Sequence, residues 1–159
     1  MAAVQDEDLM RRAISKACSG IRKGQTPFGA CVVRNGKVVS CEHNRVWMNM
    51  DITAHAEILA IRKACRKIST VDLSGCTVFS TCEPCPMCFS ACHWAGISRI
   101  VYGAEIDDAK DHGFNELFIP SATMNRYDDK RVEIRDGVLR DECVDLFIKW
   151  AMRRGSRPY

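Results

Sequence analysis

The sequence TAHAE at residues 53–57 and the sequence CEPCPMC at residues 82–88 are the most informative stretches of the chain. Cys85 and Cys88 are three residues apart across the predicted first turn of a helix, so that both sulfurs project to one side. One imidazole and two thiolates are a recognised ligand set for a catalytic zinc ion, which keeps its fourth position open for water. We therefore predict that one zinc ion is bound by His55, Cys85 and Cys88.

Glu57 is predicted to move protons rather than to bind the metal. His55 and Glu57 are too close in sequence for both to ligate one ion comfortably. A bound zinc ion lowers the pKa of its water towards about 7, and a carboxylate beside that water can shuttle the proton. Two simpler interpretations stay open. One is a closed structural site that takes Cys82 or Cys92 as its fourth ligand, and the other is a Glu57 that only caps a helix start.

The elements around these motifs alternate between helix and strand. Helices are predicted at residues 6–23, 54–67, 86–95 and 140–153, and strands at residues 28–34, 38–43, 76–81, 97–102 and 131–135. Asn35-Gly36 is a strong signal for a tight hairpin turn between the first two strands, and the later alternation suggests parallel pairing. The apolar face of the last helix is assigned to Val144, Phe147, Ile148 and Ala151. The chain is thus predicted to be one α/β domain over residues 1–159, with a mixed sheet of about five strands between helices.

Composition indicates a soluble globular protein. The 159 residues are 47% hydrophobic and 27% charged, and the net charge of +3 comes without the dense basic blocks that point to nucleic acid. The chain start does not look like a secretory signal, and charges interrupt every apolar run, which predicts a cytoplasmic protein without membrane contact. Ten cysteines in such a chain indicate metal ligands or free thiols. Those on predicted apolar faces are assigned to inert packing: Cys18, Cys31, Cys41, Cys65, Cys76 and Cys143.

Residues 26–103 resemble the cytidine deaminase superfamily. Besides the two motifs above, Pro27-Phe28-Gly29-Ala30 and Asn44 stand in the family order. The succession His-x-Glu and then Pro-Cys-x-x-Cys is the signature of zinc-dependent nucleobase deaminases. The resemblance implies a three-layer α/β/α fold with one zinc ion per subunit. It also implies a hydrolytic enzyme that replaces an exocyclic amino group by an oxo group and releases ammonia, with Glu57 protonating first a ring nitrogen and then the departing ammonia.

Within the superfamily the chain is similar to two groups with different substrates. Residues 27–29, 82–84, 94–95, 113–116 and Tyr159 resemble the bacterial guanine deaminases, which act on a free purine. Residues 124–125, 131–134, 137–139 and 141–143 are similar to the tRNA adenosine deaminases, whose last helix helps to hold the anticodon loop. We predict guanine, or a related amino-purine or heterocycle, as the substrate. The alternatives are adenosine in tRNA, and then cytosine or a nucleoside.

An RNA substrate would require cations that contact its phosphates. The tail offers Lys149, Arg153, Arg154 and Arg157. Acidic residues immediately upstream would repel the same RNA backbone: Asp136, Asp141, Glu142 and Asp145. This balance of charges favours a small substrate. A module that only binds RNA or a catalytic partner subunit is a further alternative, and the presence of Glu57 argues against it.

The resemblance also implies further site residues and a partner. Substrate contacts are implied for Asn44, Phe28, Ala56, Glu83, Glu116 and Tyr159. Asparagine is also common in turns, and phenylalanine is usually found in the core. For Asn44 and Phe28 a purely structural role therefore stays open beside the substrate contact. The sequence departs from the family at Asp51-Ile52, where Asp-Pro is usual, so the loop before His55 is expected to differ. A homodimer is implied, and in guanine deaminases the tail with its tyrosine crosses to the partner subunit.

Overall fold

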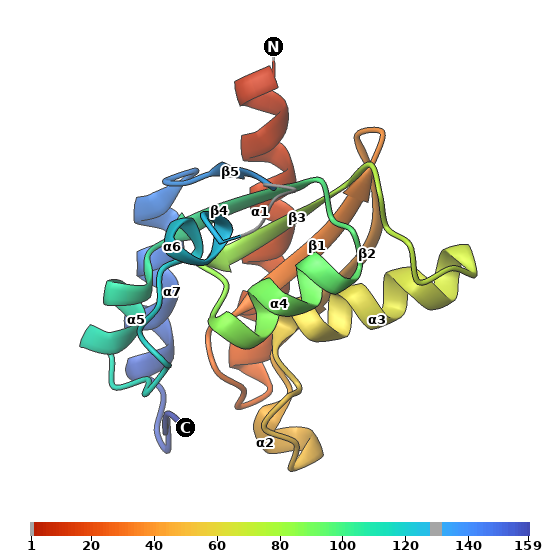
Figure 1. Cartoon of the computed structure of the whole chain (residues 1–159). Coiled ribbons are helices and arrows are strands. Elements are labelled where there is room, and N and C mark those ends of the chain that lie inside the picture. Colours follow the sequence, from red (N-terminus) through yellow and green to blue (C-terminus); the bar gives the residue numbers. More distant parts are fainter. Residues whose placement is uncertain (1, 128–131) are drawn as a thin grey trace.

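The computed structural model, which describes residues 2–127 and 132–159, has a mixed sheet of five strands at its centre (Figure 1). The strands are β1 (Gly29–Arg34), β2 (Lys37–His43), β3 (Cys76–Cys82), β4 (Arg99–Ala104) and β5 (Glu133–Arg135), in the order β2-β1-β3-β4-β5. β1 pairs antiparallel with β2 and β3, whereas β3, β4 and β5 run parallel. The predicted mixed sheet is confirmed. Residue 131, the predicted start of the last strand, lies outside the described residues.

Helices cover both faces of the sheet. They are α1 (Ala2–Arg22), α2 (Val46–Asn49), α3 (Ala56–Ile68), α4 (Pro86–Trp94), α5 (Ile106–Asp111), α6 (Ser121–Asn125) and α7 (Arg140–Ala151). α1 and α7 pack on one face, and α3 and α4 lie on the other, which gives the predicted three layers (Figure 1). None of the helices in the described part of the chain is long and apolar enough to cross a membrane.

The turn between β1 and β2 is the one that the sequence predicts. Asn35 and Gly36 have φ values of 50° and 71°, the left-handed conformation that both central residues of a type I′ turn require. The other end of β1 lies very close to α1, because a Cβ atom added at Gly29 would come within 2.3 Å of the Ala13 carbonyl oxygen. Only glycine permits this approach. Gly29 therefore serves the packing of α1 on the sheet.

The apolar face assigned to the last helix is wrong at two of its four residues, since Val144 is partly buried against the core. Ile148 and Ala151 are exposed, whereas Phe147 is buried as predicted. The buried residues of α7 are Cys143, Leu146, Phe147 and Trp150. They follow the i, i+3, i+4, i+7 spacing of a helical stripe, and the next residue after Phe147 points about 100° away from it. Phe147 packs against Phe28, and Trp150 at the end of the stripe packs against Phe114.

Cys31 and Cys41 are not free thiols. The two residues are direct cross-strand partners in β1 and β2, and a disulfide joins them. Their assignment to inert packing is therefore wrong, because the register that places two cysteines opposite each other depends on the strand pairing rather than on either residue. The other cysteines of that group are free and buried or partly buried, as predicted: Cys18, Cys65, Cys76 and Cys143.

Candidate active site

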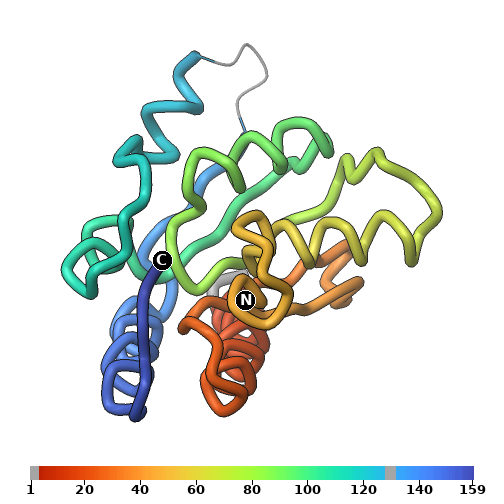
Figure 2. Tube along the Cα trace, turned by 90° about the horizontal axis from the view of Figure 1, so that it is seen from below, coloured from red at the N-terminus to blue at the C-terminus, as the bar shows by residue number. Residues whose placement is uncertain are grey.

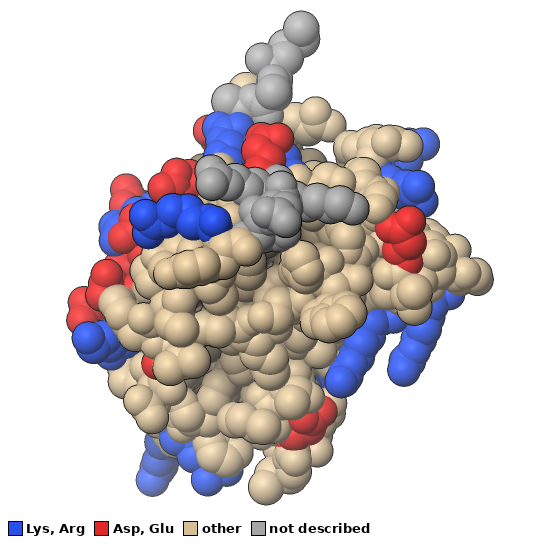
Figure 3. All heavy atoms as spheres, viewed as in Figure 1, with Lys and Arg blue, Asp and Glu red and all other residues tan. Residues whose placement is uncertain are grey.

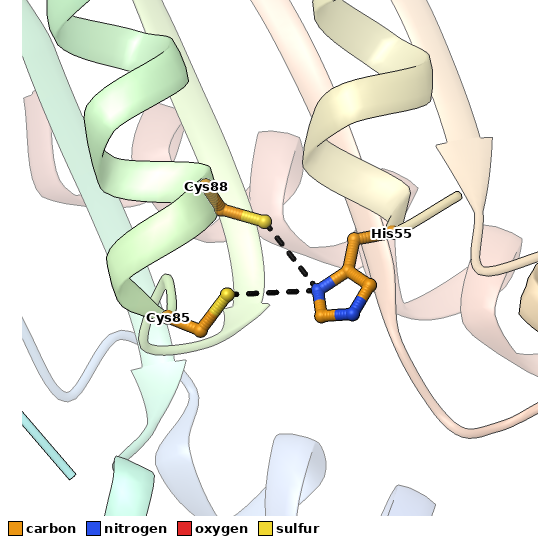
Figure 4. A group of neighbouring side chains, drawn as sticks. All are labelled: His55, Cys85 and Cys88. Carbon is orange, nitrogen blue, oxygen red and sulfur yellow. Dashed lines mark hydrogen bonds between the residues drawn. The ribbon is translucent and has the colours of Figure 1, made fainter. Parts of the chain in front are cut away.

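Three side chains meet at the starts of two neighbouring helices. His55 is the N-cap residue of α3 in an extended conformation, so that the helix begins at Ala56 rather than at the predicted Ala54. Cys85 is the N-cap residue of α4, and Cys88 lies in its first turn. Since α3 and α4 pack against each other, the imidazole and the two sulfurs point toward one another (Figure 4).

The distances between these side chains fit a tetrahedral zinc ion. His55 Nδ1 lies 3.6 Å from Cys85 Sγ and 3.5 Å from Cys88 Sγ, and all three ligand atoms lie within 4.8 Å of one another. With a Zn–N distance of about 2.05 Å and a Zn–S distance of about 2.3 Å, a tetrahedral ion separates its nitrogen and sulfur ligands by about 3.6 Å. The site therefore fits zinc without rearrangement.

Local hydrogen bonds prepare the sulfurs for a cation. A hydrogen bond from Cys88, and then one from His55, lowers the pKa of Cys85 to about 4, although burial opposes this shift. Burial is the main reason that the pKa of Cys88 lies well above its ordinary value. These shifts favour the Cys85 thiolate and the Cys88 thiol, and a bound cation would favour the loss of the Cys88 proton as well.

Glu57 lies in the first turn of α3, beside the ligands. Its Oε2 is 3.5 Å from the Cys88 sulfur, and its Oε1 accepts a hydrogen bond of 2.9 Å from the Ser80 hydroxyl. Burial raises the pKa of this carboxyl. A residue that only capped the helix would face solvent, whereas Glu57 is 6% exposed. A buried carboxyl beside an open metal position is placed to take up and deliver a proton.

The described residues do not form the closed structural site that uses a fourth cysteine. Neither Cys82 nor Cys92 belongs to the group of neighbouring ligand atoms. The Cys82 sulfur instead lies 3.5 Å from the Glu105 carbonyl oxygen. Burial raises the pKa of both thiols above the ordinary value. Both are therefore neutral packing groups, and a metal ion held by His55, Cys85 and Cys88 would keep its fourth position for water or substrate.

A pocket of 330 Å³ opens beside the ligands. Its walls are Ile52, His55, Cys85, Pro86, Met87, Asn115, Glu116, Leu117 and Tyr159. The sequence predicts His55, Cys85, Glu116 and Tyr159 for the site. No sequence motif identifies the apolar side chains of the pocket wall, such as Met87 and Leu117. Ile52, however, stands where the sequence departs from the family pattern. The volume is at the lower end of the range for small-molecule sites.

Glu116 places a carboxyl in the wall of this pocket. Its Oε2 is buried and has no hydrogen-bond partner in the part of the chain that the structure describes. Burial, reinforced by the charges of Cys85 and Glu57, raises the pKa of Glu116 to about 8. A buried polar atom without a partner costs free energy. A ligand with a hydrogen-bond donor would remove this cost.

Tyr159 closes one side of the pocket. The Asn44 amide donates a hydrogen bond of 2.6 Å to the Tyr159 hydroxyl and accepts one of 3.0 Å from the Val46 N–H. Asn44 is thus a turn residue whose amide also reaches the pocket wall. The Tyr159 ring lies 5.5 Å from the His55 ring. The tail reaches the pocket of its own chain here, and its exchange between subunits stays a prediction.

Three of the implied contact residues have side chains outside the pocket. Both carboxylate oxygens of Glu83 accept backbone N–H groups, Oε2 from Ile106 at 3.2 Å and Oε1 from Ser121 at 2.7 Å. Phe28 packs edge-on against core aromatic rings, as its core interpretation predicts, and Ala56 is fully buried. Contacts of these three residues with a substrate stay predictions. Glu83 fixes the positions of two loops.

The fold and the metal site together define a class of protein, the zinc-type deaminases. Residues 3–104 match the family described as "Cytidine and deoxycytidylate deaminase zinc-binding region". The matched range covers more than half of the chain and includes His55, Glu57, Cys85 and Cys88. The chain belongs to this family.

Its relatives include two kinds of deaminase. Guanine deaminase of Bacillus subtilis (strain 168) is 42% identical over 114 residues, which are 71% of this chain and 73% of that protein. The tRNA-specific adenosine deaminase of the same organism is 36% identical over 139 residues, 87% of this chain and 84% of that protein. A solved structure of guanine deaminase from Nitrosomonas europaea has a TM-score of 0.84 at 31% identity and covers 91% of this chain and 83% of its own. The chain is a deaminase, a hydrolase that acts on the carbon–nitrogen bond of an amidine.

Proposed function

We propose that this deaminase acts on a free amino-purine, with guanine as its substrate. The observation that carries the proposal is the buried Glu116 oxygen in the pocket wall, which has no partner among the described residues. With its pKa raised to about 8, Glu116 is largely protonated at neutral pH without a ligand, but in its ionised form the carboxylate only accepts hydrogen bonds. Guanine presents N–H donors on adjacent atoms of its edge, whereas adenine and cytosine present a ring-nitrogen acceptor at the corresponding place. Hydrogen bonds from guanine would also favour the ionised form of Glu116.

In the proposed reaction the residues of this chain bind the base and move the protons. A zinc ion held by His55, Cys85 and Cys88 supplies an activated water molecule when it is bound. Glu57 takes up one proton from the attacking water and delivers it to a ring nitrogen, and it then transfers the second proton, from the added hydroxyl, to the departing amino group. The Ser80 hydroxyl holds Glu57 in place. Water adds at the amino-bearing carbon, the carbon–nitrogen bond breaks, ammonia leaves and an oxo group remains.

The tail cations support a small substrate rather than RNA. Arg153 donates to the Ile21 carbonyl oxygen, and the Arg157 guanidinium lies 3.7 Å from the centroid of the Trp47 ring. Two of the cations that the sequence offers to RNA phosphates are thus engaged within the chain. A base in a folded RNA would also have to pass Tyr159, which forms part of the pocket wall.

The relatives support the same choice and keep a second candidate open. Similar solved structures hold purine analogues, one with 2,6-diaminopurine at a TM-score of 0.88 and 30% identity, and one with 8-azaguanine at 0.85 and 31%. The tRNA adenosine deaminase of Bacillus subtilis, however, matches over 139 residues and the guanine deaminase over 114. Deamination of adenosine in tRNA is therefore the second candidate.

An ammonia-release screen with zinc-loaded protein tests the proposal. Its substrates are guanine, adenine and cytosine, the corresponding nucleosides, and tRNA assayed for inosine. We expect kcat/KM for guanine to exceed that of every other substrate by about 10²-fold or more, because a site built around matched hydrogen bonds rejects substrates that lack them. Inosine in tRNA without ammonia from any free base would establish the second candidate instead. No product from any substrate would favour a binding module.

We further propose that the chain forms a homodimer through the face that carries α4. Met87 and Trp94 on this helix are 36% and 86% exposed. Figure 3 shows a broad uncharged area in the middle of this face, with charged side chains toward its edges. Exposed apolar patches with polar rims mark interaction surfaces. In sedimentation velocity we expect a dimer for the unmodified chain and a monomer for Trp94→Glu, and a monomeric unmodified chain would contradict the proposal.

A further inference from the structure

The tail that carries Tyr159 has no regular secondary structure. After α7, residues 152–159 turn back toward the pocket, and Figure 2 shows this darkest blue segment running from the end of α7 to the middle of the molecule. A segment without helix or strand stays in place only through the contacts that offset its conformational entropy. The contacts that hold the tail therefore determine how well Tyr159 closes the pocket.

Trp47 holds the tail through two contacts with a single residue. The guanidinium carbon of Arg157 lies 3.7 Å from the centroid of the Trp47 ring. The indole Nε1–H of Trp47 donates a hydrogen bond of 3.2 Å to the carbonyl oxygen of Arg157. Tryptophan is the aromatic residue that attracts a cation most strongly. Trp47 thus fixes both the side chain and the backbone of Arg157, close to Tyr159 in sequence.

Trp47 itself sits on an anchored loop. It belongs to α2, and the backbone N–H groups on either side of it donate to the side chains of Asn44, at 3.0 Å, and Gln25, at 3.1 Å. The same Asn44 donates to the Tyr159 hydroxyl. The loop that carries Asn44 and Trp47 therefore contacts the tail at two residues. Asn44 binds Tyr159 in the pocket wall, and Trp47 binds Arg157 outside the pocket.

We infer that Trp47 is a positioning residue for substrate recognition. By clamping Arg157 it keeps Tyr159 over the pocket, and this closure selects free bases against bases that carry ribose. The inference rests on the proposed function, because it concerns the same pocket. In a pocket of 330 Å³ with Tyr159 as one wall, a sugar on the base would have to displace the tail, and the clamp opposes that displacement.

Tyrosine labelling measures the closure without any substrate. The chain contains three tyrosines, of which Tyr127 is exposed and Tyr102 is buried, so that two internal references accompany Tyr159. Acetylation by N-acetylimidazole is followed by peptide mass spectrometry. We expect Trp47→Ala to speed the acetylation of Tyr159 relative to Tyr127 by about ten-fold, from the loss of one cation–π contact and one hydrogen bond. Arg154→Ala, which removes an exposed cation of the same tail, is the matched control and leaves the rate unchanged.

Steady-state kinetics with guanine and guanosine measure the consequence for selection. We expect Trp47→Ala to raise KM for guanine by about ten-fold and to change kcat by less than about two-fold, because closure holds ground state and transition state equally. The ratio of kcat/KM for guanine to kcat/KM for guanosine is expected to fall in Trp47→Ala by a similar factor. Arg157→Ala removes the cation but keeps the backbone carbonyl that Trp47 binds, so we expect a smaller change in the same direction. Arg157→Lys, which keeps a cation for the ring, stays near the wild type. Adding Trp47→Ala to Tyr159→Ala has no further effect, since the two residues act through one another.

Two results would overturn the inference: unchanged acetylation of Tyr159 in both Trp47→Ala and Arg157→Ala, or a loss of kcat with an unchanged KM. Because Arg157 is exposed, its variants keep the test valid if Trp47→Ala folds poorly. The labelling result is independent of the substrate. Faster acetylation without guanine turnover supports the clamp and refutes the proposed function, whereas unchanged acetylation with normal turnover refutes the clamp alone.

Discussion

Cys85→Ser is expected to remove the metal and to reduce deaminase activity by at least about 10⁴-fold, because without zinc the pKa of water returns from about 7 to 15.7. A serine hydroxyl stays protonated at neutral pH and does not replace a thiolate ligand. The ligand group among the described residues consists of His55, Cys85 and Cys88, so no other described side chain of the group can replace the lost thiolate. Zinc per chain, measured by elemental mass spectrometry, should fall from one to none.

The matched control for this experiment is Cys82→Ser. Cys82 belongs to the same motif and is buried beside the site, but its sulfur faces the Glu105 carbonyl oxygen and not the ligand group. A hydroxyl can make the same contact, so this variant is expected to keep its zinc and most of its activity. Equal metal loss in both variants would mean that the motif forms a different ligand set.

Glu57→Gln is expected to lower kcat by about 10²–10⁴-fold, the usual contribution of a positioned general acid and base. Glutamine has nearly the same shape and still accepts the hydrogen bond from Ser80, but it cannot carry the proton between water and base. Zinc content should stay at one per chain. The thermal midpoint should not fall, because a buried neutral amide costs less to desolvate than a carboxylate.

Glu42→Gln is the control for the loss of a buried carboxylate elsewhere. Glu42 pairs with Arg45 and Lys63 and is not among the ligand group or the pocket walls. This variant is expected to lose some stability and to keep its kcat. If Glu57→Gln retained more than about a tenth of the wild-type kcat, proton transfer by Glu57 would not be the source of catalysis.

The metal site can be predicted from sequence because its geometry is local. Cys85 and Cys88 share one helical turn, and His55 and Glu57 share the start of another helix, so residue spacing sets most of their relative positions. Only the approach of α3 to α4 depends on the rest of the fold. The hairpin at Asn35-Gly36 is predictable for the same reason, since the turn requires these residue types.

The features that the sequence does not reveal depend on contacts between distant segments. The Glu83 side chain points toward two backbone N–H groups that are more than twenty residues away in sequence. The motif that contains Glu83 does not indicate this orientation. The pairing of Cys31 with Cys41 depends on strand register. The route of the tail depends on Trp47, which is far from Arg157 in sequence. Helical spacing alone also does not determine which of the neighbouring apolar residues of α7 are buried.

The carboxylate of Glu83 has a consequence for how such a molecule can change over evolutionary time. It ties down Ile106 at one end and Ser121 at the other end of the stretch that carries Glu116, while the metal is held elsewhere. Insertions or replacements between those two anchors can remodel what the enzyme recognises and leave its chemistry intact.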